Sequence, residues 1–260
     1  MDITKSKAVY MSKKIKQFCF SMLSPIIYSF FIGWKLAIIL TITIAWHEYS
    51  HLLAAKFIKI KTGGFILIPF VGGAAFILEK YKAYWQNAFV ALAGPIGGMI
   101  LAVFITLMWK ITNIQILAPI AFYMSIINVF NLAPLSFLDG GQVLDTLTYS
   151  INRTFGMVLH IASTVFAAVV ITWKLNPTIG IMIIMFGGAS IITEIKNWRA
   201  YRSGNKHLCT NDYLYPPKLL DWKQALAVVA VWMATIAILV GNGSYLVNTA
   251  KADMTMIFHK

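Results

Sequence analysis

Several uninterrupted apolar runs in this sequence approach or exceed the roughly 20 residues that an α-helix needs to cross a lipid bilayer. The 260 residues are 59% apolar and only 12% charged, whereas soluble domains usually carry about 25% charged residues. This composition disfavours a soluble protein with a very large core. We therefore predict an all-α polytopic membrane protein with six or seven transmembrane helices. The expected spans are 17–33, 34–57, 87–109, 114–135, 155–173, 177–193 and 224–247.

The excess of positive charge is best explained by membrane topology. The net charge is +13, and Lys and Arg accumulate in the cytoplasmic loops of membrane proteins. Nothing in the sequence resembles a nucleic-acid-binding module. A basic N-terminus and a basic stretch at 194–223 are expected in the cytoplasm, in a multi-pass plasma (inner) membrane protein. If the segment 17–33, which contains Pro25, does not cross, six spans remain instead of seven.

One predicted span contains a metal-binding pattern, HEYSH at residues 47–51. His47 and His51 are four residues apart, so both lie on one helix face, about 6 Å apart along the axis. Two imidazoles in this arrangement can bind one zinc ion, and Glu48 beside them can take a proton from a zinc-bound water. A chance match is disfavoured, because a charged side chain at the bilayer centre costs at least about 2.5–3.5 kcal/mol.

Catalytic zinc usually takes three protein ligands, and the nine acidic residues include the candidates for the third. Asp139 stands out because it follows an apolar span broken by Pro134, and the Gly140-Gly141 pair after it permits a sharp turn. Asp145 is expected to face water and Glu194 to form a surface ion pair with Lys196. The remaining candidates lie in polar or interfacial stretches: Asp2, Glu79, Asp212, Asp221 and Asp253.

Two motifs in this order, HEYSH at 47–51 and the pattern N-x-x-P-x-x-x-L-D-G-G at 131–141, resemble the site-2 protease family of intramembrane zinc metalloproteases. The resemblance covers roughly residues 34–150. It implies that His47, His51 and Asp139 bind Zn2+ and that Glu48 is the general base. The catalytic membrane core is then 34–150, preceded by 1–33. It is followed by additional helices at 151–193, the basic stretch at 194–223 and a last helix with its tail at 224–260.

Other residues are expected to have supporting or packing roles. Asn131 and Pro134 are candidates for supporting the site or binding substrate, and Asn128 for an interhelical hydrogen bond. The segment AGPIGG at 93–98 resembles a family motif in which many relatives carry an asparagine. Here Gly97 and Gly98 are interpreted as close-packing positions. His160 is expected to be a buried polar-network histidine.

The segment 62–78 predicts a small membrane-associated hairpin or loop, because two Gly-Gly pairs flank an apolar stretch with Pro69. A transmembrane substrate must unwind before hydrolysis, and an exposed strand edge can hold the unwound peptide. The residues expected to do this are Phe65, Ile66, Leu67 and Ile68. The expected partners are therefore a transmembrane protein or peptide substrate, the lipid bilayer and a possible regulatory membrane protein.

Two alternatives remain open at this stage. A membrane zincin of the prenyl-protein protease type would take its third ligand from a downstream glutamate, for which Glu194 is the candidate. A zinc transporter or another non-proteolytic zinc-binding membrane protein is the second alternative. A transporter would be expected to carry more acidic or histidine residues across different spans than this chain does.

Overall fold

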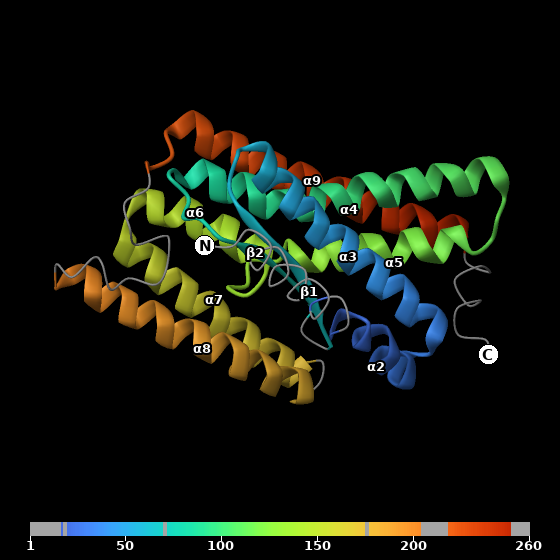
Figure 1. Cartoon of the computed structure of the whole chain (residues 1–260), viewed down its shortest axis with the longest axis horizontal. Helices are drawn as coiled ribbons and strands as arrows, with labels where there is room; N and C mark the ends of the chain where they lie inside the picture. Colours follow the sequence, from blue (N-terminus) through green and yellow to red (C-terminus); the bar gives the residue numbers. More distant parts are fainter. Residues whose placement is uncertain (1–16, 18–19, 70–71, 175–176, 204–217, 251–260) are drawn as a thin grey trace, which may run out of the picture. The chain divides into compact units, whose positions relative to one another are not determined.

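The computed structural model describes residues 17, 20–69, 72–174, 177–203 and 218–250 and is mostly helical (Figure 1). Its elements are a series of helices interrupted by one antiparallel pair of strands. In chain order they are α2 (Leu23–Ile32), α3 (Trp34–Phe57), β1 (Thr62–Ile68), β2 (Gly72–Ile77), α4 (Tyr84–Thr112), α5 (Leu117–Asn131), α6 (Asp139–Ile151), α7 (Arg153–Lys174), α8 (Pro177–Arg202) and α9 (Trp222–Thr249).

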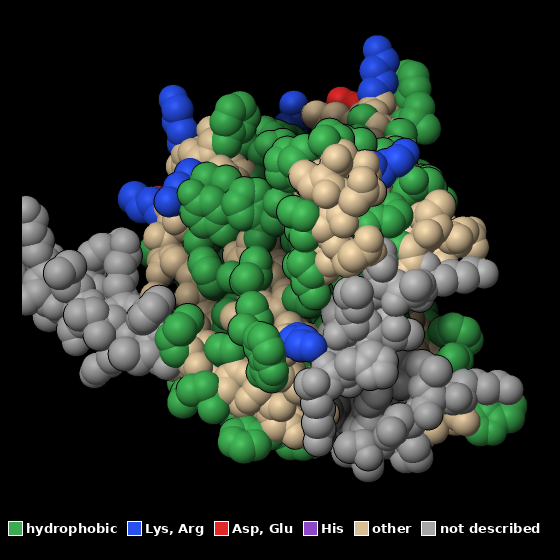
Figure 2. Space-filling view, turned by 90° about the vertical axis from the view of Figure 1, so that its right-hand side faces the viewer, with side chains coloured by type: hydrophobic (Ala, Val, Ile, Leu, Met, Phe, Trp, Pro, Cys, Tyr) green, Lys and Arg blue, Asp and Glu red, His purple; other side chains and the backbone are tan. Residues whose placement is uncertain are grey.

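Four described helices are long and apolar enough to cross a membrane. They are α3, α4, the part of α7 at Arg153–Val170, and α9, while α2 and α5 are shorter apolar helices. Large apolar side chains are exposed along α9, as lipid-facing side chains would be, and Figure 2 shows hydrophobic side chains over much of one face. The prediction of a mostly helical protein with several candidate membrane spans is confirmed. The count of six or seven spans stays a prediction.

The chain divides into two compact units. Among the described residues, the first contains those up to 79, those at 96–129 and those at 237–250, and the second contains those within 80–95 and 130–236. In the first unit α2 and α3 pack together, and Gly33 between them has a φ of 79°, a left-handed conformation that favours glycine. Both strands also contact α3, which places the strand pair beside the helix that carries the HEYSH motif.

The expected hairpin is a two-stranded antiparallel sheet. Phe65 pairs with Ala75, and Leu67 pairs with Gly73. At the base of the hairpin the Lys61 ammonium lies 2.9 Å from the Glu79 carboxylate. The hydrogen bond and the negative charge of Glu79 together raise the pKa of Lys61 above its ordinary value. The prediction of a hairpin is thus confirmed, whereas its association with the membrane stays a prediction.

In the second unit α7 packs along α8 and α6 packs against α7 (Figure 1). His160 of α7 is buried and bridges the other two helices. Its Nδ1 lies 2.8 Å from Oδ2 of Asp145 in α6, and its Nε2 lies 3.0 Å from Oγ of Ser190 in α8. The expectation of a buried polar-network histidine is confirmed.

Two expectations about acidic residues were wrong. Asp145 does not face water: only 3% of it is exposed, because α6 continues past Asp139 as a helix and turns this carboxylate towards α7. Glu194 is not a surface residue either. It is 1% exposed and accepts a hydrogen bond from the Tyr149 hydroxyl, because the buried face of α8 extends beyond its apolar run.

Candidate metal centre

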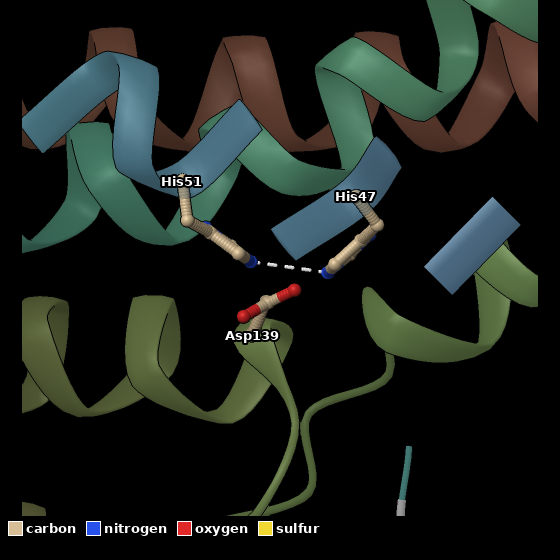
Figure 3. Close-up of side chains that lie close together, drawn as sticks. All are labelled: His47, His51 and Asp139. Atoms are coloured by element: carbon tan, nitrogen blue, oxygen red, sulfur yellow. Dashed lines mark hydrogen bonds between the residues drawn. The ribbon is translucent and has the colours of Figure 1, made fainter. Parts of the chain in front are cut away.

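The two histidines of the HEYSH motif lie side by side on the buried face of α3. Their Nε2 atoms are 3.0 Å apart, and the rings meet nearly edge to face at an interplanar angle of 79° (Figure 3). Zn–N distances of about 2.0–2.1 Å in tetrahedral geometry would separate two ligand nitrogens by about 3.3 Å. The spacing of this pair therefore suits two ligands of one zinc ion.

The other ring nitrogen of His47 is occupied by a hydrogen bond. Its Nδ1 lies 2.9 Å from Oδ1 of Asn128 in α5. The amide nitrogen of Asn128 in turn donates to the carbonyl of Met124, 2.8 Å away. Because Oδ1 can only accept, Nδ1 of His47 must carry the hydrogen, which leaves the lone pair of Nε2 for a metal.

Asp139 is the first residue of α6, immediately after the break that Pro134 introduces. Helix α5 ends at Asn131, and Leu138 is the N-cap of α6. A carboxylate in the first turn of a helix is favoured by the helix dipole. Asp139 is only 8% exposed.

The turn between α5 and α6 folds back closely on the start of α6. A Cβ at Gly140 would overlap the backbone carbonyl of Leu132, and a Cβ at Gly141 would overlap that of Leu135. The Trp232 indole of α9 donates to the Leu132 carbonyl at 3.0 Å. A carbonyl freed by the helix break is thus satisfied by protein, as a break within a membrane requires.

His47, His51 and Asp139 form the group suited to a metal ion among the described residues. Each contributes one ligand atom, these atoms all lie within 4.8 Å of one another, and all three residues are buried (Figure 3). Two imidazoles and one carboxylate are a donor set typical of catalytic zinc, which leaves a fourth position for water or substrate. The residues that the sequence predicted as ligands therefore fit Zn2+.

Glu48 lies beside the first histidine and is buried, with 7% of it exposed. Its side chain packs against the backbone of Gly73 in β2, where an added Cβ would lie 2.5 Å from Oε1 of Glu48. The hairpin therefore approaches the carboxylate expected to act as the base. Only a glycine at position 73 permits this approach.

Part of this chain is similar to a protease family. Residues 35–114 match the family model described as Peptidase family M50, and this region includes the histidine pair and Glu48. The resemblance to the site-2 protease family is thereby confirmed. The matched region ends before Asp139, so the third ligand rests on the geometry described above.

Two curated relatives are zinc metalloproteases by name. A zinc metalloprotease of Methanocaldococcus jannaschii is 25% identical over 157 residues, which are 58% of this chain and 42% of that protein. A protein of Synechocystis sp., provisionally named a zinc metalloprotease, is 31% identical over 141 residues, which are 52% of this chain and 36% of the relative. The match thus spans less than half the length of either relative.

The other residues that the sequence singled out lie in or beside α4 and α5. Asn131 is half-buried at the end of α5 and Pro134 is exposed in the following turn, so their support of the site stays a prediction. Gly97 and Gly98 are close-packing positions, as expected, since a Cβ on either would overlap a neighbouring side chain. The hydrogen bond expected of Asn128 exists, but its partner His47 was not predicted.

Proposed function

We propose that this protein is an intramembrane zinc metalloprotease that hydrolyses peptide bonds in the transmembrane segments of other membrane proteins. The observation that carries the proposal is the buried group of His47, His51 and Asp139, with Glu48 in the same helix turn as the first ligand. The M50 match and the names of the two relatives support the protease activity. The candidate membrane spans support its intramembrane setting.

The chemistry divides between the metal and one carboxylate. When bound, zinc would polarise the scissile carbonyl and lower the pKa of water toward about 7. Glu48 takes the proton of the attacking water at its carboxylate and later gives it to the leaving amine. The Nδ1–H of His47 stays on Asn128, so His47 acts as a ligand and not as a proton carrier.

The hairpin is the proposed place where an unwound substrate strand is held. A peptide in a transmembrane helix keeps its N–H and C=O groups in the i→i−4 ladder, so the scissile bond must first leave that ladder. Pairing with the edge of a sheet replaces the lost hydrogen bonds and extends the peptide for attack. The contact between Gly73 and Glu48 supports this role, because it brings the hairpin next to the base.

Of the two edges, we favour that of β2. On β1, the N–H of Leu67 donates to Oγ of Ser21 at 3.0 Å, and the Tyr28 hydroxyl makes a long bond of 3.5 Å to the Ile68 carbonyl. The β1 edge is thus partly occupied. Phe65 to Ile68 then support β2 by pairing with it, and the substrate adds beside Gly73.

The proposed setting of the reaction is the cytoplasmic side of the plasma (inner) membrane. The enrichment of Lys and Arg at the expected cytoplasmic ends supports this setting. Regulated membrane proteins and leftover signal peptides are the substrate classes that this location offers. A regulatory membrane partner is compatible with such a reaction.

The two alternatives are weakened by separate observations. The prenyl-protein protease type would need a glutamate as third ligand, but Glu194 accepts a bond from Tyr149, and the metal group contains Asp139 instead. For a zinc transporter the further histidine of the described spans, His160, is already bonded to Asp145 and Ser190. A non-proteolytic zinc protein would have no use for Glu48 in this position.

The proposal is tested by incubating the purified full chain with a panel of single-span membrane proteins and identifying the products by mass spectrometry. The matched variant is Glu48→Gln, which should bind zinc normally and yield no product. Zinc-dependent cuts within the membrane segments, present only with the wild-type protein, are the expected result. Zinc uptake into proteoliposomes without any cleavage would instead favour the transporter.

A further inference from the structure

The Gly97-Gly98 pair in α4 brings three helices close together within the first unit. Gly97 faces α3, where an added Cβ would lie 2.6 Å from Cβ of Ser50, and its carbonyl accepts a 2.9 Å bond from the Trp46 indole. Gly98 faces α5, where an added Cβ would overlap the amide group of Asn128. The absence of a side chain at position 98 therefore makes the space that Asn128 fills.

The amide of Asn128 is held at both of its ends. Asn128 is fully buried, its nitrogen donates to the carbonyl of Met124, and its oxygen accepts from Nδ1 of His47. The two bonds fix which end of the amide faces the histidine, since a carbonyl can only accept a hydrogen bond. The amide cannot turn over without losing both bonds.

Helix α5 is itself held one turn away from this amide. Asn242 of α9 donates to Oγ of Ser125 at 3.1 Å, and Ser125 donates to the Ala121 carbonyl. Ala118 and Ala121 of α5 pack in the same buried cluster as Leu246 of α9. The packing of α5 against α9 therefore helps to hold Asn128 in place opposite His47 of α3.

We propose that Asn128 is a positioning residue for the metal centre, and that Gly98 exists to admit it. By accepting the Nδ1 hydrogen of His47, Asn128 fixes the tautomer and the ring plane that present Nε2 to the metal. Such partners of a metal-binding histidine typically raise metal affinity about 10–100-fold. The inference rests on the metal site of the proposed function but not on its substrates.

The test is cobalt binding by the purified, metal-free full chain, followed by visible absorption, which reports ligand geometry independently of proteolysis. Asn128→Ala should weaken Co2+ binding about 10–100-fold and change the absorption spectrum. Asn128→Asp retains an oxygen acceptor for His47 and should keep affinity and spectrum near those of the wild type. Gly241→Ala in α9, where an added Cβ meets nothing within 4 Å, is the matched control and should bind normally.

Gly98→Ala is the second test, because it should displace the Asn128 amide although neither Asn128 nor His47 is replaced. Its Cβ should displace Asn128 and reproduce the weakened binding of Asn128→Ala. In the double variant, Gly98→Ala should add nothing further, because the group it would overlap has been removed. Normal Co2+ binding by Asn128→Ala, or additive losses in the double variant, would overturn the proposal. If the wild-type protein cleaved no substrate while all variants bound cobalt as expected, the result would count against the proposed function and leave this inference standing.

Discussion

Replacing Gly73 with alanine should disable the base while leaving the metal ligands in place. The added Cβ would lie 2.5 Å from Oε1 and 2.6 Å from Cδ of Glu48. Carbon and oxygen atoms in ordinary contact lie about 3.5 Å apart or more, so either the strand or the carboxylate must move by about 1 Å. A misplacement of that size at a reacting group can cost about 100-fold in rate.

The predicted result is therefore a fall in kcat of about 100-fold for Gly73→Ala, with the affinity for zinc unchanged. Cleavage of one transmembrane substrate and zinc content would be measured on the same preparations. Gly63→Ala in β1 is the matched control, because its Cβ would approach only Leu78 and Phe76, at 3.2 Å each.

Two results would refute the reasoning. Full activity of Gly73→Ala would mean that β2 does not press on the working position of Glu48. Loss of zinc together with activity would mean that the substitution disturbs α3 as a whole and not the base.

Further predictions concern the third ligand, the hairpin edge and the second polar cluster. Asp139→Asn should reduce zinc content at equal yield of folded protein, whereas Glu194→Gln should not, as metal analysis of both variants will show. Because Leu67 gives its N–H to Ser21, its partner Gly73 and then Ala75 should direct their N–H groups to the open edge of β2. Ala75→Pro should therefore reduce cleavage and spare zinc; unchanged cleavage by a folded variant would contradict strand addition at this edge. His160→Ala should lower stability by about 1–3 kcal/mol, seen as a lower unfolding temperature in detergent, because it leaves the Asp145 carboxylate buried without this bond.

The polar cluster of Asp145, His160 and Ser190 is distinct from the metal site, and its hydrogen bonds are connected as in a serine hydrolase triad. Asp145 bonds to Nδ1 of His160, and Nε2 of His160 bonds to Ser190. Ser190 lies inside α8, where backbone N–H groups donate to the helical ladder and are not available to an oxyanion. We therefore expect this cluster to hold α6, α7 and α8 together, in keeping with the usual role of polar groups between membrane helices.

The sequence was most informative where a rule of spacing or chemistry applies locally. The i and i+4 histidines, the glutamate beside them and the aspartate after the helix break were all identifiable from the residues. The hairpin followed from its glycine pairs. The burial of Asp145 and Glu194 was not predicted, because burial depends on which helix covers a residue. Neighbouring charges suggested a surface position for Glu194, but Lys196 lies on another face of the helix. The bond between Asn128 and His47 depends on packing of α5 against α3, across a separation of 81 residues that no local pattern reports.

The indole of Trp232 on the carbonyl of Leu132 ties the middle of the chain to its last described helix. The turn that presents Asp139 is made well before the ribosome reaches α9, so this carbonyl has no such donor while the nascent chain is being inserted. We expect the turn to reach its final form only after α9 has entered the membrane. Maturation of the candidate metal site would then wait for the synthesis and insertion of α9.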